Sequence, residues 1–124
     1  MLNKQALLLP EPALRLVFYL QLIAVFILAC LPVSDSPLFS INDKLLHSLT
    51  FLVLGAFFLA SHRKNPTPLL QLTLLALYGL LIEATQSLLD YREADIFDIV
   101  ADLFGLAICY GGFGLYQRRR QKSP

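Results

Sequence analysis

Four long runs of apolar residues dominate the chain, and short polar stretches separate them. The runs cover residues 13–31, 43–61, 69–89 and 96–116. Each run is close to the ~20 residues that a helix needs to cross a hydrocarbon core of about 30 Å. Because the links are short and rich in Pro, Ser, Asn or charge, consecutive helices should be antiparallel neighbours. The pattern predicts an all-α, integral membrane fold of four antiparallel transmembrane helices in one bundle.

The composition agrees with this prediction and limits the function. Of the 124 residues, 56% are hydrophobic and 15% are charged, whereas soluble domains have about 25% charged residues. Four membrane-spanning helices use nearly the whole length, so we expect a single domain over residues 1–124 whose surroundings are the lipid bilayer. The net charge of +1 gives no reason to expect nucleic acid as a partner, because such binding needs clustered Lys and Arg.

Charged residues are separated by sign along the predicted topology. If the chain starts inside and crosses four times, all ten Lys and Arg residues except Lys44 and Arg92 fall on the inner side. These residues are Lys4, Arg15, Arg63, Lys64, Arg118, Arg119, Arg120 and Lys122. All acidic residues except Glu11 fall in outer loops or near the outer helix ends, including Asp35, Asp90 and Glu93. Because cytoplasmic loops accumulate Lys and Arg, we expect a multi-pass protein with both termini in the cytoplasm.

Ionisable and amide side chains lie inside three of the four apolar runs. Inserting an ionisable group into a membrane costs a few kcal/mol or more, so such a residue is a candidate for function. Residues three or four apart share one helix face. The pairs are Asp43 with His47, Glu83 with Gln86, and Asp98 with Asp102, and Asp95 extends the last row by one turn.

Three of these side chains are predicted to lie at a similar depth. With about 1.5 Å per residue, His47 is roughly 6 Å below the outer end of its helix, and Glu83 and Asp102 are roughly 9 Å below theirs. We therefore expect His47, Glu83 and Asp102 to meet in one pocket on the outer side. Gln86 can donate and accept hydrogen bonds, so it is the natural partner to orient Glu83.

Structural roles are the alternative interpretation of the same residues. Asp43 and Asp95 stand where predicted helices begin, so an N-cap role would explain each of them. Asp98 falls in a first helical turn, where a carboxylate suits the helix dipole. Polar side chains inside a membrane also join helices by hydrogen bonds. The last helix should pack closely against a neighbour through Ala101 and Gly105, continued by Gly112.

The polar positions follow the pattern of a known family. Its pieces are Asp43-Lys44-x-x-His47 with Phe51 and Gly55, then Gly79, Glu83 and Gln86, then Arg92, Asp95, Asp98, Ala101 and Gly105. Over about residues 43–105 the chain resembles the VanZ-like family of bacterial membrane proteins, which usually has Ala-Asn where this chain has Ala101-Asp102. The resemblance implies a small multi-spanning protein of the bacterial cell envelope, in the cytoplasmic (inner) membrane. It also implies a link to glycopeptide resistance of the teicoplanin type, with no settled biochemical activity.

These observations lead to two hypotheses. In the first, an outward-facing polar site binds or processes an envelope or lipid-linked ligand. The candidate catalytic residues are His47, Glu83, Asp98 and Asp102, and the candidate ligand-binding residues are Asp43, Lys44, Gln86, Arg92 and Asp95. In the second, the chain is a non-catalytic packing or assembly module whose buried polar residues hold the helices together.

The first hypothesis assigns a chemical role to each kind of side chain. Glu83 or His47 would act as general base, and Asp98 or Asp102 as acid or metal ligand. Arg92 and Lys44 would hold an anionic group such as phosphate. Carboxylates beside a histidine suit Mg²⁺, Mn²⁺ or Ca²⁺ better than zinc, but the spacing matches no recognised metal motif. The sequence leaves open the metal, any cofactor, the oligomeric state and whether the protein is an enzyme.

Overall fold

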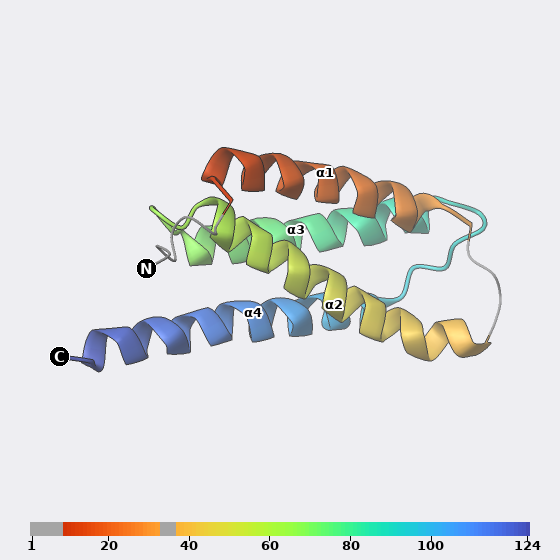
Figure 1. The fold of residues 1–124 in the computed structure, drawn as a ribbon. Coiled ribbons are helices and arrows are strands. Elements are labelled where there is room, and N and C mark those ends of the chain that lie inside the picture. The colour runs from red at the N-terminus through yellow and green to blue at the C-terminus, as the bar shows by residue number, and fades with distance from the viewer. Residues whose placement is uncertain (1–8, 33–36) are drawn as a thin grey trace.

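Four α-helices make up the structure, a computed structural model that describes residues 9–32 and 37–124, with side chains in the second range described from Asn42 onward. The helices are α1 (Glu11–Cys30), α2 (Pro37–Ser61), α3 (Pro68–Ser87) and α4 (Ile96–Lys122) (Figure 1). All four are long and apolar enough to cross a membrane. The described residues contain no strand. The predicted all-α membrane bundle is confirmed.

Proline and aspartate mark the helix starts that the structure describes. Pro12 and Pro68 lie in the first turns of α1 and α3, where the missing N–H of proline needs no partner. Asp95 is the N-cap of α4, and its side chain accepts a hydrogen bond from the Phe97 amide at 2.9 Å. The predicted N-cap role of Asp95 is therefore confirmed. Lys4 and Asp35, two of the residues in the predicted separation of charge, lie outside the described residues.

Two helix boundaries differ clearly from the sequence prediction. Helix α2 begins at Pro37 rather than at Asp43, because a proline is compatible with a first helical turn and the polar residues after it do not prevent a helix. Asp43 consequently lies in the second turn, and the N-cap interpretation of this residue is wrong. Helix α4 continues to Lys122 instead of ending at Tyr116, since basic side chains suit the negative end of a helix dipole. The bounds of α1 and α3 differ from the prediction by two residues at most.

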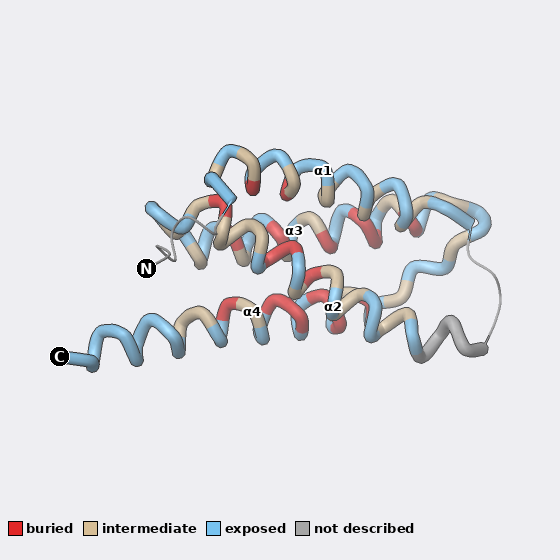
Figure 2. Tube along the Cα trace, in the orientation of Figure 1, coloured by how far each residue is buried: buried red, intermediate tan, exposed pale blue. Residues whose placement is uncertain are grey.

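Helices α2 and α3 each contact all of the other helices, and the contact between α2 and α4 is the most extensive. Helix α1 packs on α2 and α3, and α4 packs on the same two helices. The buried residues face inward between the helices (Figure 2). The apolar core that they form consists of Phe18, Phe51, Leu54, Leu75, Ile82, Leu106 and Tyr110.

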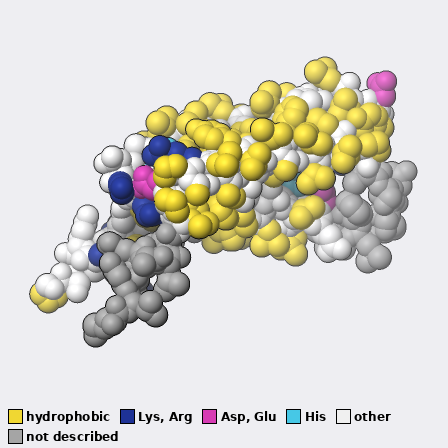
Figure 3. Space-filling view, turned by 45° about the horizontal axis from the view of Figure 1, so that its top comes forward, with side chains coloured by type: hydrophobic (Ala, Val, Ile, Leu, Met, Phe, Trp, Pro, Cys, Tyr) yellow, Lys and Arg dark blue, Asp and Glu magenta, His cyan; other side chains and the backbone are white. Residues whose placement is uncertain are grey.

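The outer surface is apolar over most of its area. Large hydrophobic side chains on all four helices are exposed, Leu69 at 76% and Leu28 at 65% among them. The space-filling view shows a nearly continuous apolar face, with basic side chains gathered near one end (Figure 3). A soluble protein rarely exposes so large an apolar area, whereas lipid chains cover such a surface favourably.

Basic and acidic side chains gather at opposite ends of the bundle. Where α1 begins and α2 ends, the Arg15 side chain donates to the Ser61 carbonyl at 3.1 Å, and the Lys64 amide donates to Glu11 at 2.9 Å. We call this the basic end, and α4 also finishes there (Figure 1). The opposite end, which contains the loop of residues 88–95 and the start of α4, is the acidic end. Which end faces the cytoplasm stays a prediction.

Candidate functional site

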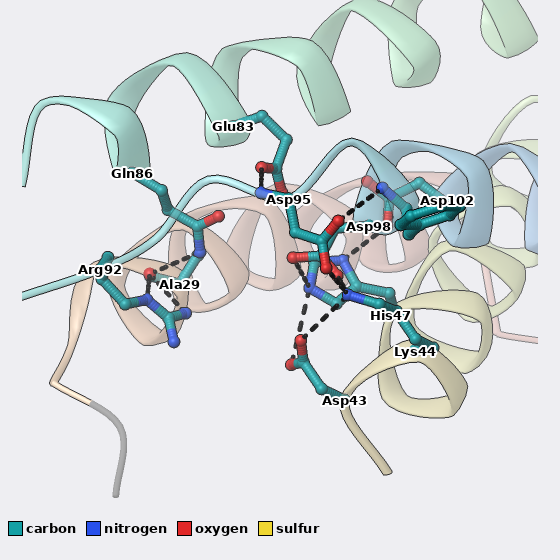
Figure 4. Close-up of polar contacts among 11 residues, drawn as sticks. Ala29, Asp43, Lys44, His47, Glu83, Gln86, Arg92, Asp95, Asp98 and Asp102 are labelled. Atoms are coloured by element: carbon teal, nitrogen blue, oxygen red, sulfur yellow. Dashed lines mark hydrogen bonds and ion pairs between the residues drawn. The ribbon is translucent and has the colours of Figure 1, made fainter. Parts of the chain in front are cut away.

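A cluster of charged side chains joins α2 to the start of α4 at the acidic end (Figure 4). The Lys44 ammonium donates to Asp95 Oδ2 at 2.7 Å and also to Asp98 Oδ1. Its nitrogen lies 3.9 Å from Asp43 Oδ2. Lys44 therefore connects three carboxylates that come from two helices and a helix cap.

His47 lies one turn further along α2 and faces three carboxylates. Its Nδ1 is 2.8 Å from Asp102 Oδ1. When Asp102 is ionised, Nδ1 is the donor in this hydrogen bond, because an ionised carboxylate only accepts. Its Nε2 lies 3.6 Å from Asp98 Oδ2 and 3.8 Å from Asp43 Oδ1, both longer than a hydrogen bond. Asp98 and Asp102 are buried, at 5% and 2% exposure.

Small residues allow α2, α3 and α4 to approach each other at this site. The Ser48 hydroxyl donates to the Ala101 carbonyl at 2.9 Å, and a Cβ added to Gly105 would overlap the Ser48 carbonyl. A Cβ on Gly79 would lie 2.9 Å from Asp102 Oδ2. The predicted close packing at Ala101 and Gly105 is confirmed.

The predicted continuation of this close packing along α4 is wrong. Gly112 has nothing within 4 Å of the position of an added Cβ. Helix α4 has moved away from its neighbours by that point, and its last turns are exposed (Figure 2).

Glu83 reaches the cluster from α3, but indirectly. Its Oε2 accepts a hydrogen bond from the Asp95 amide at 3.1 Å, while its buried Oε1 has no hydrogen-bond partner among the described residues. His47 and Asp102 are in direct contact, and Glu83 is linked to them through the start of α4. The structure therefore brings the three residues to one region without joining them in a single contact.

Gln86 and Arg92 meet at the end of α1 rather than beside Glu83. The Ala29 carbonyl accepts from Gln86 Nε2 at 2.9 Å and from Arg92 Nε and Nη2 at 3.1 and 2.8 Å. The carbonyls of a last helical turn have no partner within the helix, which explains why this oxygen attracts both side chains. The predicted pairing of Gln86 with Glu83 is wrong for this reason. The buried Gln86 Oε1 has no partner among the described residues.

A cavity of about 290 Å³ opens between α1, α2 and α3 beside the cluster. Its wall combines apolar side chains from three helices with a few polar ones. The lining residues are Val25, Leu28, Ala29, Asp43, Leu46, His47, Thr50, Phe51, Ile82, Gln86 and Arg92. A few polar groups in a mostly apolar pocket are typical of a small-molecule site.

The charges of the site are unequal in number. Asp43, Glu83, Asp95, Asp98 and Asp102 supply five carboxyl groups, against the cations of Lys44 and Arg92 and the imidazole of His47. At the rim, the hydrogen bond from Lys44, followed by the one from the Phe97 amide, lowers the pKa of Asp95 below its ordinary value. Asp95 therefore stays ionised and holds Lys44 in place.

The structure divides the predicted site residues into two groups. Asp43, Lys44, His47, Asp95, Asp98 and Asp102 form the charged cluster, with Glu83 attached to it, and Gln86 and Arg92 gather at Ala29. The sequence pattern did not identify Thr50 and Ala29, which both line the cavity, or the Ala29 carbonyl as the shared acceptor. Thr50 follows Asp43 and His47 at the spacing of one helix face, so this periodicity was a usable signal. A backbone carbonyl leaves no such signal.

The fold and this site define a class of small integral membrane proteins in which four helices carry a charged cluster at one end of the bundle. The family model for VanZ/LLP1 matches residues 7–117. The chain belongs to this family. The resemblance over residues 43–105 is thereby confirmed, and the match extends over α1 as well.

One relative is an uncharacterized protein of the fission yeast Schizosaccharomyces pombe. It is 39% identical over 83 residues, which are 64% of this chain and 51% of the relative. The chain thus spans about half the length of that protein. No solved structure matches the chain.

Proposed function

We propose that the acidic end of the bundle binds a membrane amphiphile with an apolar tail and an oxygen-rich polar head. In what we call the processing form of this proposal, the site also transforms the bound amphiphile. One observation carries the proposal. The cavity of about 290 Å³ has apolar walls from α1, α2 and α3 and a polar lining that includes Gln86 and Arg92. The apolar part suits a lipid chain, and the polar part suits a head group such as phosphate.

The polar lining retains hydrogen-bonding capacity that helix packing does not use. Gln86 is 2% exposed, and its Oε1 has no partner among the described residues. A buried polar atom without a partner costs about 1–3 kcal/mol, so a ligand hydroxyl or amine that donates to this oxygen would recover that cost. Arg92 uses two of its nitrogens on Ala29, and the remaining guanidinium edge is suited to an anionic group.

The packing hypothesis explains part of the same site. Ser48 with Ala101 and Gln86 with Ala29 are hydrogen bonds between helices, and such bonds hold membrane helices together. A site that only packs helices has no need for buried oxygens without partners. Among the described residues, five buried side-chain atoms have no partner, and three of them belong to Glu83, Gln86 and Asp102 at this end of the bundle. Of these three residues, Gln86 lines the cavity, and its free oxygen favours the ligand site over the packing module.

In the processing form of the proposal, four side chains supply proton transfer. His47, oriented by Asp102 at 2.8 Å, or Glu83, with one oxygen free of hydrogen bonds within the described chain, acts as the base. Asp98 acts as the acid where His47 is the base, because an Asp102 that accepts from His47 has no proton to give, and Asp98 or Asp102 acts as the acid where Glu83 is the base. Lys44 is already bound to Asp95 and Asp98. Arg92, which lines the cavity, is therefore the residue that binds the anionic head group.

The biological setting is proposed at two levels. The sequence pattern favours a bacterial inner membrane, with a lipid-linked envelope molecule as ligand and an effect on teicoplanin-type glycopeptide susceptibility. The relative in fission yeast favours a ligand class that membranes with and without a bacterial wall share. A lipid with a phosphate head and a long apolar tail is compatible with the bacterial setting and with the relative in fission yeast.

Photocrosslinking tests the proposal directly. The purified full chain in nanodiscs is exposed to photoactivatable phosphatidylglycerol or photoactivatable polyprenyl phosphate, and crosslinks are located by mass spectrometry. We expect crosslinks to the cavity residues of α1, α2 and α3. Gln86→Leu and Arg92→Gln should each reduce them about tenfold, the effect of losing one hydrogen bond to a charged group.

Gln71→Leu is the matched control for this experiment. Gln71 is also a buried glutamine of α3, and its Nε2 has no partner among the described residues. Its Oε1 accepts a hydrogen bond from the Tyr110 hydroxyl, and the residue does not line the cavity. Its crosslinking should equal that of the wild type. Crosslinks confined to the outer apolar faces, or unchanged by Gln86→Leu and Arg92→Gln, would overturn the proposal. Labelling by the polyprenyl probe alone would narrow the ligand to a lipid-linked carrier.

A further inference from the structure

We infer that Asp43, His47 and Asp98 form a binding site for one divalent cation of the class that prefers oxygen ligands, such as Mn²⁺ or Mg²⁺. Each residue offers one ligand atom, and the three atoms lie within 4.8 Å of one another. The inference deepens the proposed function. Only the role of the bound cation, which is to hold the phosphate of the amphiphile, rests on that proposed function.

The distances around His47 fit a cation better than a direct ion pair. Its Nε2 is 3.6 Å from Asp98 Oδ2 and 3.8 Å from Asp43 Oδ1, too far for a hydrogen bond to either oxygen. Two ligand atoms bound to the same cation at about 2.1–2.2 Å are roughly 3.0 Å apart at neighbouring octahedral positions and roughly 4.3 Å apart at opposite ones. Both separations lie between these values, so a small shift of the Asp43 and Asp98 carboxylates would bring all three atoms to one ion.

The hydrogen bond on the other ring nitrogen orients His47 for this role. Nδ1 lies 2.8 Å from Asp102 Oδ1, and when it donates there, a neutral imidazole has its lone pair on Nε2, which faces Asp43 and Asp98. Metal-binding histidines nearly always donate their second nitrogen to a carboxylate or carbonyl in this way. Asp102 thus acts as a positioning residue and not as a ligand.

A buried carboxylate from a third helix extends toward the same cluster. Glu83 is 6% exposed and extends from α3 toward the cluster, where its Oε1 has no hydrogen-bond partner among the described residues (Figure 4). A carboxylate oxygen at this position can accept from a water molecule on the cation. The cluster also has more carboxylates than cations, and a divalent ion reduces this imbalance where burial makes uncompensated charge costly.

The ligand set determines which ion fits best. Two carboxylate oxygens and one imidazole nitrogen are suited to Mn²⁺ or Mg²⁺, which complete their coordination with water. Lys44 binds the other oxygen of Asp98, so Oδ2 remains available. Since Asp43 and His47 also line the cavity, the cation would face the polar head of a bound amphiphile and hold its phosphate. With His47 engaged, Glu83 would be the base in the processing form of the proposed function.

Mn²⁺ alone is the probe for this site. The full chain, freed of metal with a chelator and kept in detergent, is titrated with Mn²⁺ and followed by electron paramagnetic resonance. We expect one bound ion, a higher melting temperature, and nitrogen modulation from His47 that His47→Gln abolishes. Asp43→Asn and Asp98→Asn should weaken binding at least tenfold, and Asp102→Asn should weaken it about 10–100-fold while keeping the nitrogen signal.

Controls separate the cation site from a general effect of acidic residues. Asp90→Asn and Glu93→Gln change exposed carboxylates of the neighbouring loop and should leave Mn²⁺ affinity unchanged. Absence of Mn²⁺ binding up to about 1 mM, the weak limit for protein sites of this kind, would overturn the inference. So would bound Mn²⁺ without nitrogen modulation in the wild type, a result that does not depend on the folding of any variant.

The two proposals fail in different ways. Gln86→Leu and Arg92→Gln should keep Mn²⁺ binding while losing the lipid crosslinks. Mn²⁺ binding without cavity crosslinks would overturn the proposed function alone. Cavity crosslinks without Mn²⁺ binding would overturn the cation site alone.

Discussion

At the scale of single residues, Lys44 and Asp95 hold the start of α4 against α2. Asp95 uses one oxygen to cap α4 through the Phe97 amide and the other to bind Lys44 at 2.7 Å. Its backbone amide also donates to Glu83. One residue outside the membrane-spanning part of α4 therefore connects three helices, so its charge should contribute measurably to stability.

The pH dependence of stability tests the charge of Asp95. Because its pKa is lowered in the folded protein, the ionised form contributes stability at pH values above the unfolded pKa of about 3.9. That contribution is lost as the pH falls through the lower, folded pKa. Asp95→Asn keeps an N-cap oxygen but removes the charge. Its melting temperature should be below that of the wild type at pH 6, and the difference should narrow as the pH falls below about 4.

Thermal melting in detergent between pH 7 and pH 3 measures this effect. Asp90→Asn, at an exposed position of the same loop, should follow the wild type throughout. A difference between Asp95→Asn and wild type that stays constant with pH would contradict the assignment, since it would show that shape rather than charge is responsible.

At the scale of helices, α2 and α4 are fixed together by close backbone contact. Gly105 leaves no space for a side chain beside the Ser48 carbonyl, and Ser48 donates to Ala101 across the same contact. Seven residues later, Gly112 has open space around it. Glycine is therefore required by close packing at position 105 of α4, whereas at position 112 it has no steric role.

Alanine at each glycine compares the two positions. Gly105→Ala forces α2 and α4 apart, and overpacking of this kind costs typically 1–3 kcal/mol, which lowers a melting temperature by several degrees. Gly112→Ala should be neutral or stabilising, because Ala is favoured over Gly in a helix by about 1 kcal/mol. Differential scanning fluorimetry in detergent compares the two variants, and equal melting temperatures would refute the close contact.

Individual elements show what the sequence predicts well. Apolar runs locate all four helices because crossing a bilayer demands length and hydrophobicity together, and same-face spacing identifies Asp43 with His47 and Asp98 with Asp102 as one cluster. The start of α2 at Pro37 was missed because proline suits both a loop and a first turn. The partners of Gln86 and Arg92 were missed because the Ala29 carbonyl is invisible to side-chain patterns.

At the scale of the whole molecule, the two ends of the bundle differ in charge. The contacts of Arg15, Arg63 and Glu11 bring the start of α1 to the end of α2, and α4 finishes at the same end (Figure 1). The cluster around Lys44 and His47 is at the opposite end. This separation supports the predicted orientation, in which the basic end faces the cytoplasm.

Thiol labelling in intact cells tests the orientation. Cys30 and Cys109 are free thiols, so the experiment starts from the variant Cys30→Ala/Cys109→Ala. Glu93→Cys should then react with a membrane-impermeant maleimide, whereas Lys64→Cys should react only after the cells are opened. Labelling of position 64 and protection of position 93 in intact cells would reverse the orientation.

The four helices differ in length, so the depth of the site in the bilayer depends on the thickness of the membrane as well as on the protein. Helices α1 and α3 have 20 residues each, about 30 Å, whereas α2 and α4 have 25 and 27, about 38 and 40 Å. The two short helices therefore limit the bilayer thickness that the bundle matches without tilting or local thinning. In a membrane of longer acyl chains the ends of α1 and α3, with the Ala29 carbonyl and Gln86, would be drawn below the head groups. Access to the cavity would then decrease as acyl chains lengthen, which couples this protein to the lipid composition around it.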